Sequence, residues 1–445
     1  MSKRNFILLI IILIITGGTI FWFLSSRPNT STPEEDNIGT NFISQFNPFG
    51  NNKNPSSATN PLIEIPEYQP DATETANIKL KKVSSMPIAG FTVFSKERLK
   101  EVPLIMPETV MPTDSTVPKK TTKPTPPSTE FMPALRYVER ATGNIYETFA
   151  DKIEEKKFSI TIIPMVYEAL FGNKGNSVVM RYLKSDKKTI ITFVGTLPKE
   201  LLGADIADGN EIKGVFLPED IKDISLSGDT LSLFYLFNSG NNMIGTTLNL
   251  INNKKTQVFD SPFTEWLSSF PNNKMITFTT KPASDIPGYL YAIDPSNKNY
   301  NFHKIFGNIN GLTTTTSPDG KLILYSNDKL SLSIYNLDTK VSILLGIKTL
   351  PEKCVWNKAS NAIYCGVPKS ITNNRYPDTW YQGEVSFSDQ IWKIDIKTES
   401  ATLLLDPITI SGEDIDSIKL MLDSNENYLF FINKKDSFLW EFNLK

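Results

Sequence analysis

The sequence predicts an all-β protein, a seven-bladed β-propeller, and three observations support this fold. Short apolar runs separated by Gly, Asn, Asp and Pro turns recur along most of the chain. The clearest unit, residues 313–345, packs four such runs into the length of one propeller blade. The chain also ends on the third strand of a blade, so a closed ring would need a fourth strand from elsewhere.

The clearest unit contains four expected strands joined by three tight turns. Its first turn is Pro318-Asp319-Gly320, whose residue types favour a sharp reversal of the chain. The expected strands are residues 313–317, 322–326, 331–335 and 341–345.

Six hairpins of this kind recur along the chain at spacings of about 40 to 66 residues, which bracket the blade period. Their centres lie near residues 174, 228, 272, 319, 359 and 425. A seventh hairpin, residues 137–149, combines with residues 88–94 into a blade that a Pro-rich tract interrupts. Six blades are the main alternative, and eight blades or a two-sheet sandwich are also compatible with the pattern.

Closure of the ring involves both ends of the expected propeller. Residues 437–443 read as a third strand with no fourth strand behind them. Residues 78–83 are β-like, with alternation and β-branched residues. We expect them to pair with the last blade, which would remove an exposed sheet edge.

The N-terminus predicts a membrane anchor. Residues 1–5 carry Lys3 and Arg4 and form a short cytoplasmic tail, and residues 6–24 are 19 uncharged and mostly apolar residues. A run of this length can cross a bilayer as a helix. A cleaved signal peptide is the alternative, but it would have a shorter apolar run and a small-residue cleavage site. The basic residues before the span place the N-terminus in the cytoplasm and the propeller outside the cell membrane.

Two segments lack the apolar residues needed for a core. Residues 25–77 are rich in Ser, Thr, Asn and Pro and predict a disordered linker. A Pro-rich insert at about residues 95–133 lies within the expected propeller, residues 78–445.

The turn Ser317-Pro318-Asp319-Gly320-Lys321 looks like the blade turn of TolB-type and WD-repeat-like bacterial propellers. The resemblance covers residues 78–445 in pattern, although the full motif occurs once. It implies a propeller, and the anchored, Pro- and Thr-linked arrangement is similar to bacterial surface propellers. It leaves the function open, because propellers serve as scaffolds, binding modules and enzymes.

Composition argues against several classes of function. The formal net charge of −2 is unfavourable for binding nucleic acid, which usually requires a basic face. One histidine and two cysteines are too few for the usual metal sites, so no metal or other cofactor is predicted. The chain has no Gly-x-Ser-x-Gly motif and no Gly-rich phosphate loop. We therefore predict no catalytic residues and no enzyme.

Cys354 and Cys365 flank one expected hairpin turn. Pairing Val355 with Tyr364 would place the two cysteines opposite each other, within reach of a disulfide. An oxidised pair would persist outside the membrane. Two buried free thiols are the alternative.

A long loop, residues 366–390, interrupts the same blade between its second and third strands. Such loops share one face of a propeller with the blade-to-blade connections, and residues 238–242 and 281–288 should lie on that face. Tyr376, Trp380 and Tyr381 are candidate partner-binding residues, because long loops are often functional and Tyr and Trp favour contact surfaces. The alternative is that these aromatic side chains fold back to cover the blade.

Together these features predict a membrane-tethered, extracytoplasmic, non-catalytic module that binds or scaffolds a protein or envelope component. One alternative is a glycosidase- or lyase-like propeller enzyme with acids at its centre. The other is a structural component of a surface assembly. The sequence does not indicate whether a small molecule binds.

Overall fold

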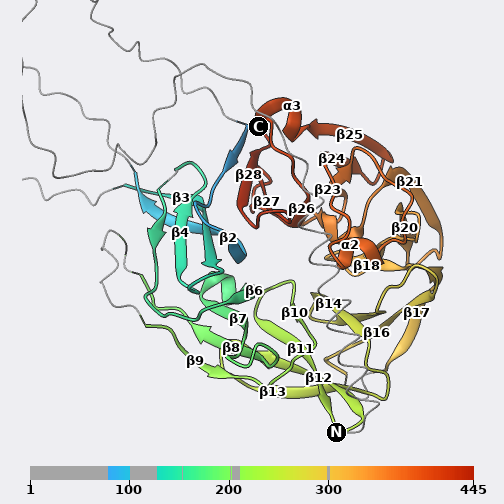
Figure 1. Cartoon of the computed structure of the whole chain (residues 1–445), viewed down its shortest axis with the longest axis horizontal. Helices are drawn as coiled ribbons and strands as arrows, with labels where there is room; N and C mark the ends of the chain where they lie inside the picture. The colour runs from blue at the N-terminus through green and yellow to red at the C-terminus, as the bar shows by residue number, and fades with distance from the viewer. Residues whose placement is uncertain (1–78, 101–127, 153, 201, 203–210, 298–300) are drawn as a thin grey trace, which may run out of the picture. The chain divides into compact units, whose positions relative to one another are not determined.

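A computed structural model describes residues 79–100, 128–152, 154–200, 202, 211–297 and 301–445. Their strands form seven four-stranded sheets, and neighbouring strands in each sheet are antiparallel. The sheets follow one another around a ring, with β6, β10, β14 and β26 near its middle and β9, β13 and β25 outside (Figure 1). The seven-bladed propeller predicted from the sequence is confirmed.

Six blades use four consecutive strands each. The first three are β2 (Ile88–Leu99), β3 (Thr129–Glu139), β4 (Ile145–Phe149) and β5 (Lys156–Lys157); β6 (Val166–Gly172), β7 (Ser177–Leu183), β8 (Ile190–Thr196) and β9 (Lys213–Phe216); and β10 (Asp223–Leu226), β11 (Ser232–Ser239), β12 (Asn242–Asn249) and β13 (Lys255–Ser261). The next three are β14 (Trp266–Asn272), β15 (Met275–Thr280), β16 (Pro287–Ile293) and β17 (His303–Asn310); β18 (Thr313–Thr316), β19 (Leu322–Ser326), β20 (Ser331–Asn336) and β21 (Ser342–Lys348); and β22 (Cys354–Trp356), β23 (Ala362–Pro368), β24 (Asp389–Asp395) and β25 (Ser400–Leu405).

The seventh blade closes the ring with a strand from the start of the propeller. It contains β26 (Ser417–Leu422), β27 (Tyr428–Asn433) and β28 (Leu439–Asn443), and β1 (Leu80–Lys82) pairs with β28. The register aligns Leu80 with Phe442 and Lys82 with Trp440. The predicted closing strand is confirmed, and the pairing covers the edge that β28 would otherwise expose.

Short helices occupy connections between strands. They are η2 (Asn173–Gly175), η3 (Pro351–Lys353), α2 (Asp378–Tyr381) and α3 (Pro407–Ser411). None of the helices in the described ranges is long and apolar enough to span a membrane. The span predicted at residues 6–24 and the linker at residues 25–77 lie outside the described residues.

The interrupted first blade has the longest strands of the ring, β2 and β3. Their pairing continues from Ile88↔Glu139 to Leu99↔Thr129. These strands therefore extend into both ends of the stretch expected to be a Pro-rich insert, leaving residues 101–127 outside the described part. Arg98 and Glu130 face each other in this register and form an ion pair at 2.8 Å, which supports the extension.

One side-chain interaction recurs at the turn between the first and second strands of four blades. An oxygen of the residue that begins the turn accepts a hydrogen bond from the backbone N–H five residues later. The residues are Ser227, Ser317, Asn357 and Asp423, with N–O distances of 2.9, 2.9, 3.0 and 2.7 Å. The third residue after each has φ between 54° and 75°, where glycine is the least strained choice. The Ser-Pro-Asp-Gly turn is therefore architectural.

Candidate functional site

The long insert of the sixth blade joins β23 to β24 and contains the short helix α2. We call residues 369–388 the insert platform. A loop of this length needs interactions of its own to take one conformation, because ordering each residue costs about 1–2 kcal/mol of backbone entropy. A buried carboxylate on the neighbouring blade holds one part of it.

That carboxylate is Asp416, which immediately precedes β26 and has no exposed side-chain surface. From the insert platform it accepts hydrogen bonds from Trp380 Nε1 at 3.1 Å, Ser386 Oγ at 3.1 Å and Phe387 N at 3.0 Å. The Nζ of Lys353 donates a further hydrogen bond to it. Asp416 thus fixes Trp380 at one end of residues 380–387 and Ser386 and Phe387 at the other end.

Lys353 lies at the end of η3 and is completely buried. Its ammonium lies 2.7 Å from Asp389 Oδ2 and also contacts Asp416. The Nζ atom lies 5.5 Å from the ring centre of Trp380 and 5.3 Å from that of Phe387. A buried lysine needs such partners, because an unpaired charge in the interior costs several kcal/mol.

The two carboxylates around Lys353 respond differently to burial. Burial tends to raise the pKa of Asp416, but the ion pair and hydrogen bond from Lys353 outweigh it and lower that pKa. Burial raises the pKa of Asp389 despite Lys353, and the charge of Asp416 raises it further. Asp416 therefore carries the negative charge of the cluster more readily than Asp389.

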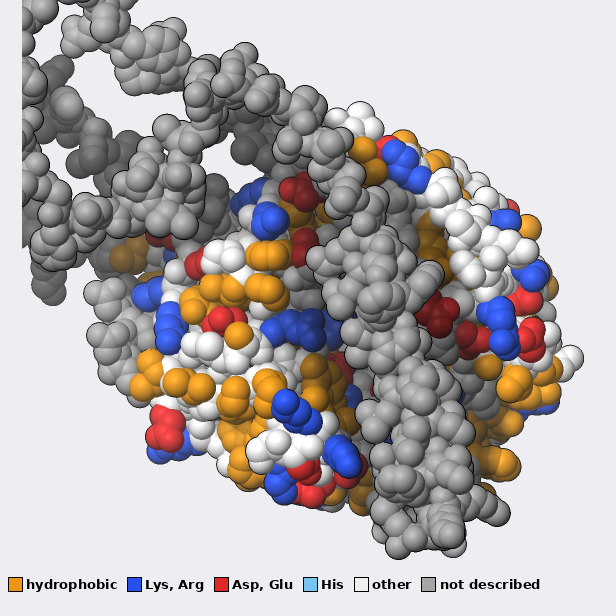
Figure 2. Space-filling model, viewed as in Figure 1, with side chains coloured by type: hydrophobic (Ala, Val, Ile, Leu, Met, Phe, Trp, Pro, Cys, Tyr) orange, Lys and Arg blue, Asp and Glu red, His pale blue; other side chains and the backbone are white. Residues whose placement is uncertain are grey.

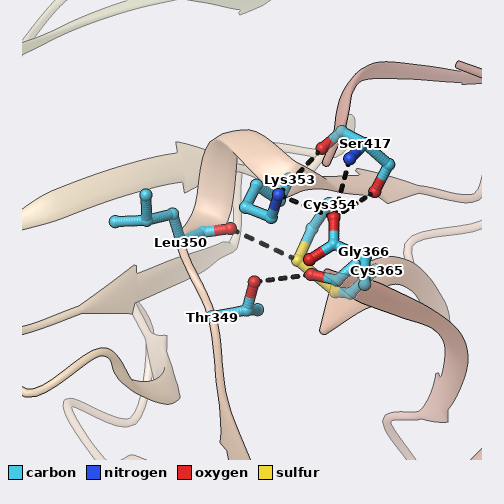
Figure 3. Close-up of a disulfide and its surroundings, with 8 residues drawn as sticks. Thr349, Leu350, Lys353, Cys354, Cys365, Gly366 and Ser417 are labelled. Atoms are coloured by element: carbon cyan, nitrogen blue, oxygen red, sulfur yellow. Dashed lines mark hydrogen bonds and ion pairs between the residues drawn. A yellow bond between two sulfur atoms is a disulfide. The ribbon is translucent and has the colours of Figure 1, made fainter. Parts of the chain in front are cut away.

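Close packing surrounds Asp389. It accepts hydrogen bonds from Ser417 N at 2.7 Å and Ser417 Oγ at 2.8 Å. A Cβ at Gly366 would lie 1.9 Å from Ser417 Oγ, so no larger residue fits this position without displacing Ser417. Figure 3 shows Gly366, Ser417 and Lys353 close to one another.

The two cysteines lie next to this cluster. Cys354 is paired with Cys365 in the β22–β23 register, as predicted, with the Cα atoms 4.1 Å apart. Their sulfur atoms are joined in a disulfide (Figure 3). Cys354 directly follows Lys353, so the disulfide and the ion cluster fix the same end of β22.

The structure separates the three aromatic residues that the sequence suggested for partner binding. Tyr376 is 2% exposed and Trp380 5% exposed, so their side chains are not available to a partner, in contrast to the expectation. They pack with Phe387, Leu330 and Leu350 in a small core of their own. The reason is that a long loop gains stability by burying its large apolar side chains. Tyr381 is 41% exposed, and its hydroxyl contacts Glu352 Oε1.

The insert platform also reaches the fourth blade. Asp378 accepts a hydrogen bond from Ser284 N at 3.0 Å, and Arg375 pairs with Asp285 at 2.6 Å. Ser284 and Asp285 belong to the β15–β16 connection, so the prediction that this connection shares a face with the platform is confirmed. The same prediction for residues 238–242 stays a prediction.

Residues 372–375 and residues 381–384 of the insert platform are solvent-exposed. The first contains the guanidinium of Arg375, and the second contains Tyr381, Gln382 and Glu384. These stretches expose a positive and a negative side chain, amide groups and one aromatic ring. The loop that carries them is anchored by the buried Asp416. Among these side chains, Tyr and Arg are of the types that are enriched at protein contact surfaces.

Sequence reasoning did not identify Lys353, Asp389 or Asp416. They are separated by more than 25 residues along the chain and have no motif in common. Their only local signal is their position at strand boundaries beside the long loop.

An apolar depression of about 570 Å³ lies on the second blade, away from the insert platform. Its wall includes Met165, Tyr182, Ile191 and Phe216. Phe216 is on β9, the outermost strand of its blade. The described residues do not group three or more His, Cys, Asp and Glu side chains in a way that could hold a metal ion.

No known family model matches the chain, and no curated protein matches its sequence. Among solved structures, an oligogalacturonate lyase from Vibrio parahaemolyticus matches 70% of this chain and 86% of its own, with a TM-score of 0.46 and 10% identity. TolB from Acinetobacter baumannii matches 70% of this chain and 76% of its own, with a TM-score of 0.38 and 11% identity. The tricorn protease matches 67% of this chain and 27% of its own, with a TM-score of 0.34 and 14% identity. The chain is a seven-bladed β-propeller, and TolB is among the proteins it resembles in fold.

Proposed function

We propose that this chain is a membrane-tethered, extracytoplasmic propeller that binds a protein or envelope component through its insert platform, without catalysing a reaction. The observation that carries the proposal is the anchoring of the platform by Asp416 through three hydrogen bonds. A surface that is already ordered loses less entropy when a partner binds. Tyr381, Gln382 and Arg375 are the side chains that this surface would offer.

A propeller enzyme with paired carboxylates is the alternative. The buried pair Asp389 and Asp416 has the proximity that such chemistry requires. Both side chains are fully buried and bridged by Lys353, however, so a substrate could reach them only if the blade opened. This arrangement favours a structural role for the pair and supports the binding proposal.

The experiment compares two arginine substitutions in the full chain. Gln382→Arg changes an exposed side chain of the insert platform. Thr339→Arg changes an exposed side chain in the β20–β21 turn, which joins a third to a fourth strand and so lies at the opposite end of its blade. We expect Gln382→Arg to reduce recovery of the partner from envelope extract about tenfold, and Thr339→Arg to leave it unchanged. Equal recovery with both variants would refute the platform as the binding surface.

The tether needs a separate test. We expect the full chain to sediment with membranes, and a chain lacking residues 1–24 to be released. Sedimentation of the truncated chain after a high-salt wash would contradict anchoring by this segment.

A further inference from the structure

The innermost strands of three consecutive blades contain β-bulges. The register shifts between Ile418 and Met421 in β26, between Ile88 and Gly90 in β2, and between Val166 and Glu168 in β6. A bulge leaves backbone groups outside the ladder and redirects a side chain, and bulges are common beside binding sites. The seventh, first and second blades therefore present an irregular patch on the inner wall of the ring.

Lys419 lies in the first of these bulges. Its φ is 52°, an unusual conformation for a non-glycine residue, and it directs the side chain away from the regular β26 ladder. Its ammonium lies 3.5 Å from the carbonyl oxygen of Ala89 and 3.8 Å from Glu168 Oε1. Ala89 and Glu168 are at the bulges of the other two strands, so all three irregularities meet at this ammonium.

A glycine makes this meeting possible. A Cβ at Gly90 would lie 1.9 Å from the carbonyl oxygen of Ala169, which means that β2 and β6 approach too closely for any side chain there. Because the two strands approach closely, Ala89 and Glu168 lie near each other, and both contact the Lys419 ammonium. Figure 2 shows Lys and Arg side chains gathered where β2 and β6 lie in Figure 1.

The positive charge of Lys419 is only partly compensated. Glu168 is already paired with Arg181 at 2.6 Å, and both contacts of the Lys419 ammonium are long for hydrogen bonds. Burial lowers the pKa of Lys419, Glu168 opposes this, and the charges of Arg140 and Arg181 add to the lowering. The side chain is nevertheless 38% exposed, so a ligand can reach it.

We propose that Lys419 is the main residue of a site that binds an oxyanion. The oxyanion would be a carboxylate or phosphate group of a small molecule. An ammonium has three N–H donors, and here the protein engages them only weakly. An oxyanion would form short, charge-assisted hydrogen bonds with it and would offset the excess of positive charge. The residues that contact the Lys419 ammonium, Ala89 and Glu168, lie outside the insert platform.

The test uses the full chain in detergent and titrates it with inorganic phosphate or with acetate, replacing chloride at constant ionic strength. A ligand that binds the folded state raises the Tm saturably. We expect saturation with at least one anion, and the anion with the lower apparent Kd identifies the source as phosphate or carboxylate. Absence of saturation with both would overturn the proposal.

Three variants make the test specific. Lys419→Asn should abolish the saturable shift, and Asn tolerates the positive φ of this position. Glu168→Gln should tighten anion binding about fivefold, because it removes a repelling charge near the site. Lys281→Asn changes an exposed lysine paired with Glu265 and should have no effect. A Lys419→Asn protein that binds as well as the unaltered chain, or a Glu168→Gln protein that does not bind more tightly, would refute the site.

Discussion

Two lysines of this propeller contact carboxylates in opposite ways. Lys353 is completely buried; its ammonium lies 2.7 Å from Asp389 Oδ2 and also contacts Asp416. Lys419 is partly exposed and lies 3.8 Å from a single carboxylate that already has an arginine partner. Protein acceptors engage the ammonium of Lys353 closely. They engage the ammonium of Lys419 only weakly, so it can still bind another molecule.

The difference teaches that the contacts of a charged residue indicate its role better than its burial alone. A saturated, buried ion cluster positions the elements around it, and removing one member leaves an uncompensated charge. A charged side chain that lacks close ion-pair partners and lies on an accessible surface is available for binding. We therefore assign Lys353 to the support of the insert platform and Lys419 to a ligand site.

The largest expected effect comes from Asp416→Ala. This change leaves Lys353 with one carboxylate and removes three hydrogen bonds from the insert platform. We expect the free energy of unfolding to fall by about 3–5 kcal/mol, measured by urea denaturation. Asp285→Ala is the matched control, because it breaks a highly exposed ion pair to the same platform and should cost about 0.5 kcal/mol or less. Similar losses for both variants would remove the distinction between the two kinds of contact.

A smaller effect concerns Asp223, whose carboxylate accepts a hydrogen bond from Ser268 N at 2.5 Å. Burial raises the pKa of Asp223 from 3.8 to about 6; the charge of Glu168 also raises it, and hydrogen bonds from Ser268 and the charge of Arg181 oppose the shift. As the pH rises from about 4 to about 6, the unfolded chain loses this proton first, so the free energy of unfolding falls.

The same group gives a direct comparison between variants. Asp223→Asn removes the titration, so its stability should decline less than that of the unaltered chain over this pH range, by about 1 to 3 kcal/mol. Urea denaturation at several pH values measures the difference. The lowered pKa of Asp416 predicts the opposite sign, because its contribution is lost as the pH falls. Parallel pH profiles for Asp223→Asn and the unaltered chain would contradict the assignment.

The sequence predicted the fold through local chemistry. Turns such as Ser317-Pro318-Asp319-Gly320-Lys321 carry their own hydrogen bonds, and β-branched strands flank them, so the blades could be counted from nearby residues. The closing strand and the register of Cys354 with Cys365 followed from the same strand pattern.

The sites depend on contacts that the sequence does not encode locally. Lys353 and Asp416 meet across two blades, and Lys419 reaches Ala89 and Glu168 through three bulges. A bulge shifts the register by one residue, which a strand pattern alone does not reveal. The burial of Tyr376 and Trp380 likewise depends on how the loop folds over the blade.

The most direct measurement of the contrast between the two lysines is an NMR titration of the full chain, labelled with 13C at the lysine Cε position, with inorganic phosphate and acetate. Lys419→Asn identifies the Lys419 signal, and the signal of Lys353 serves as the internal reference for a saturated lysine. We expect the Lys419 signal to shift saturably with at least one of the anions and the Lys353 signal to stay in place. A Lys419 signal that stays fixed with both anions, or moves only together with that of Lys353, would contradict the account.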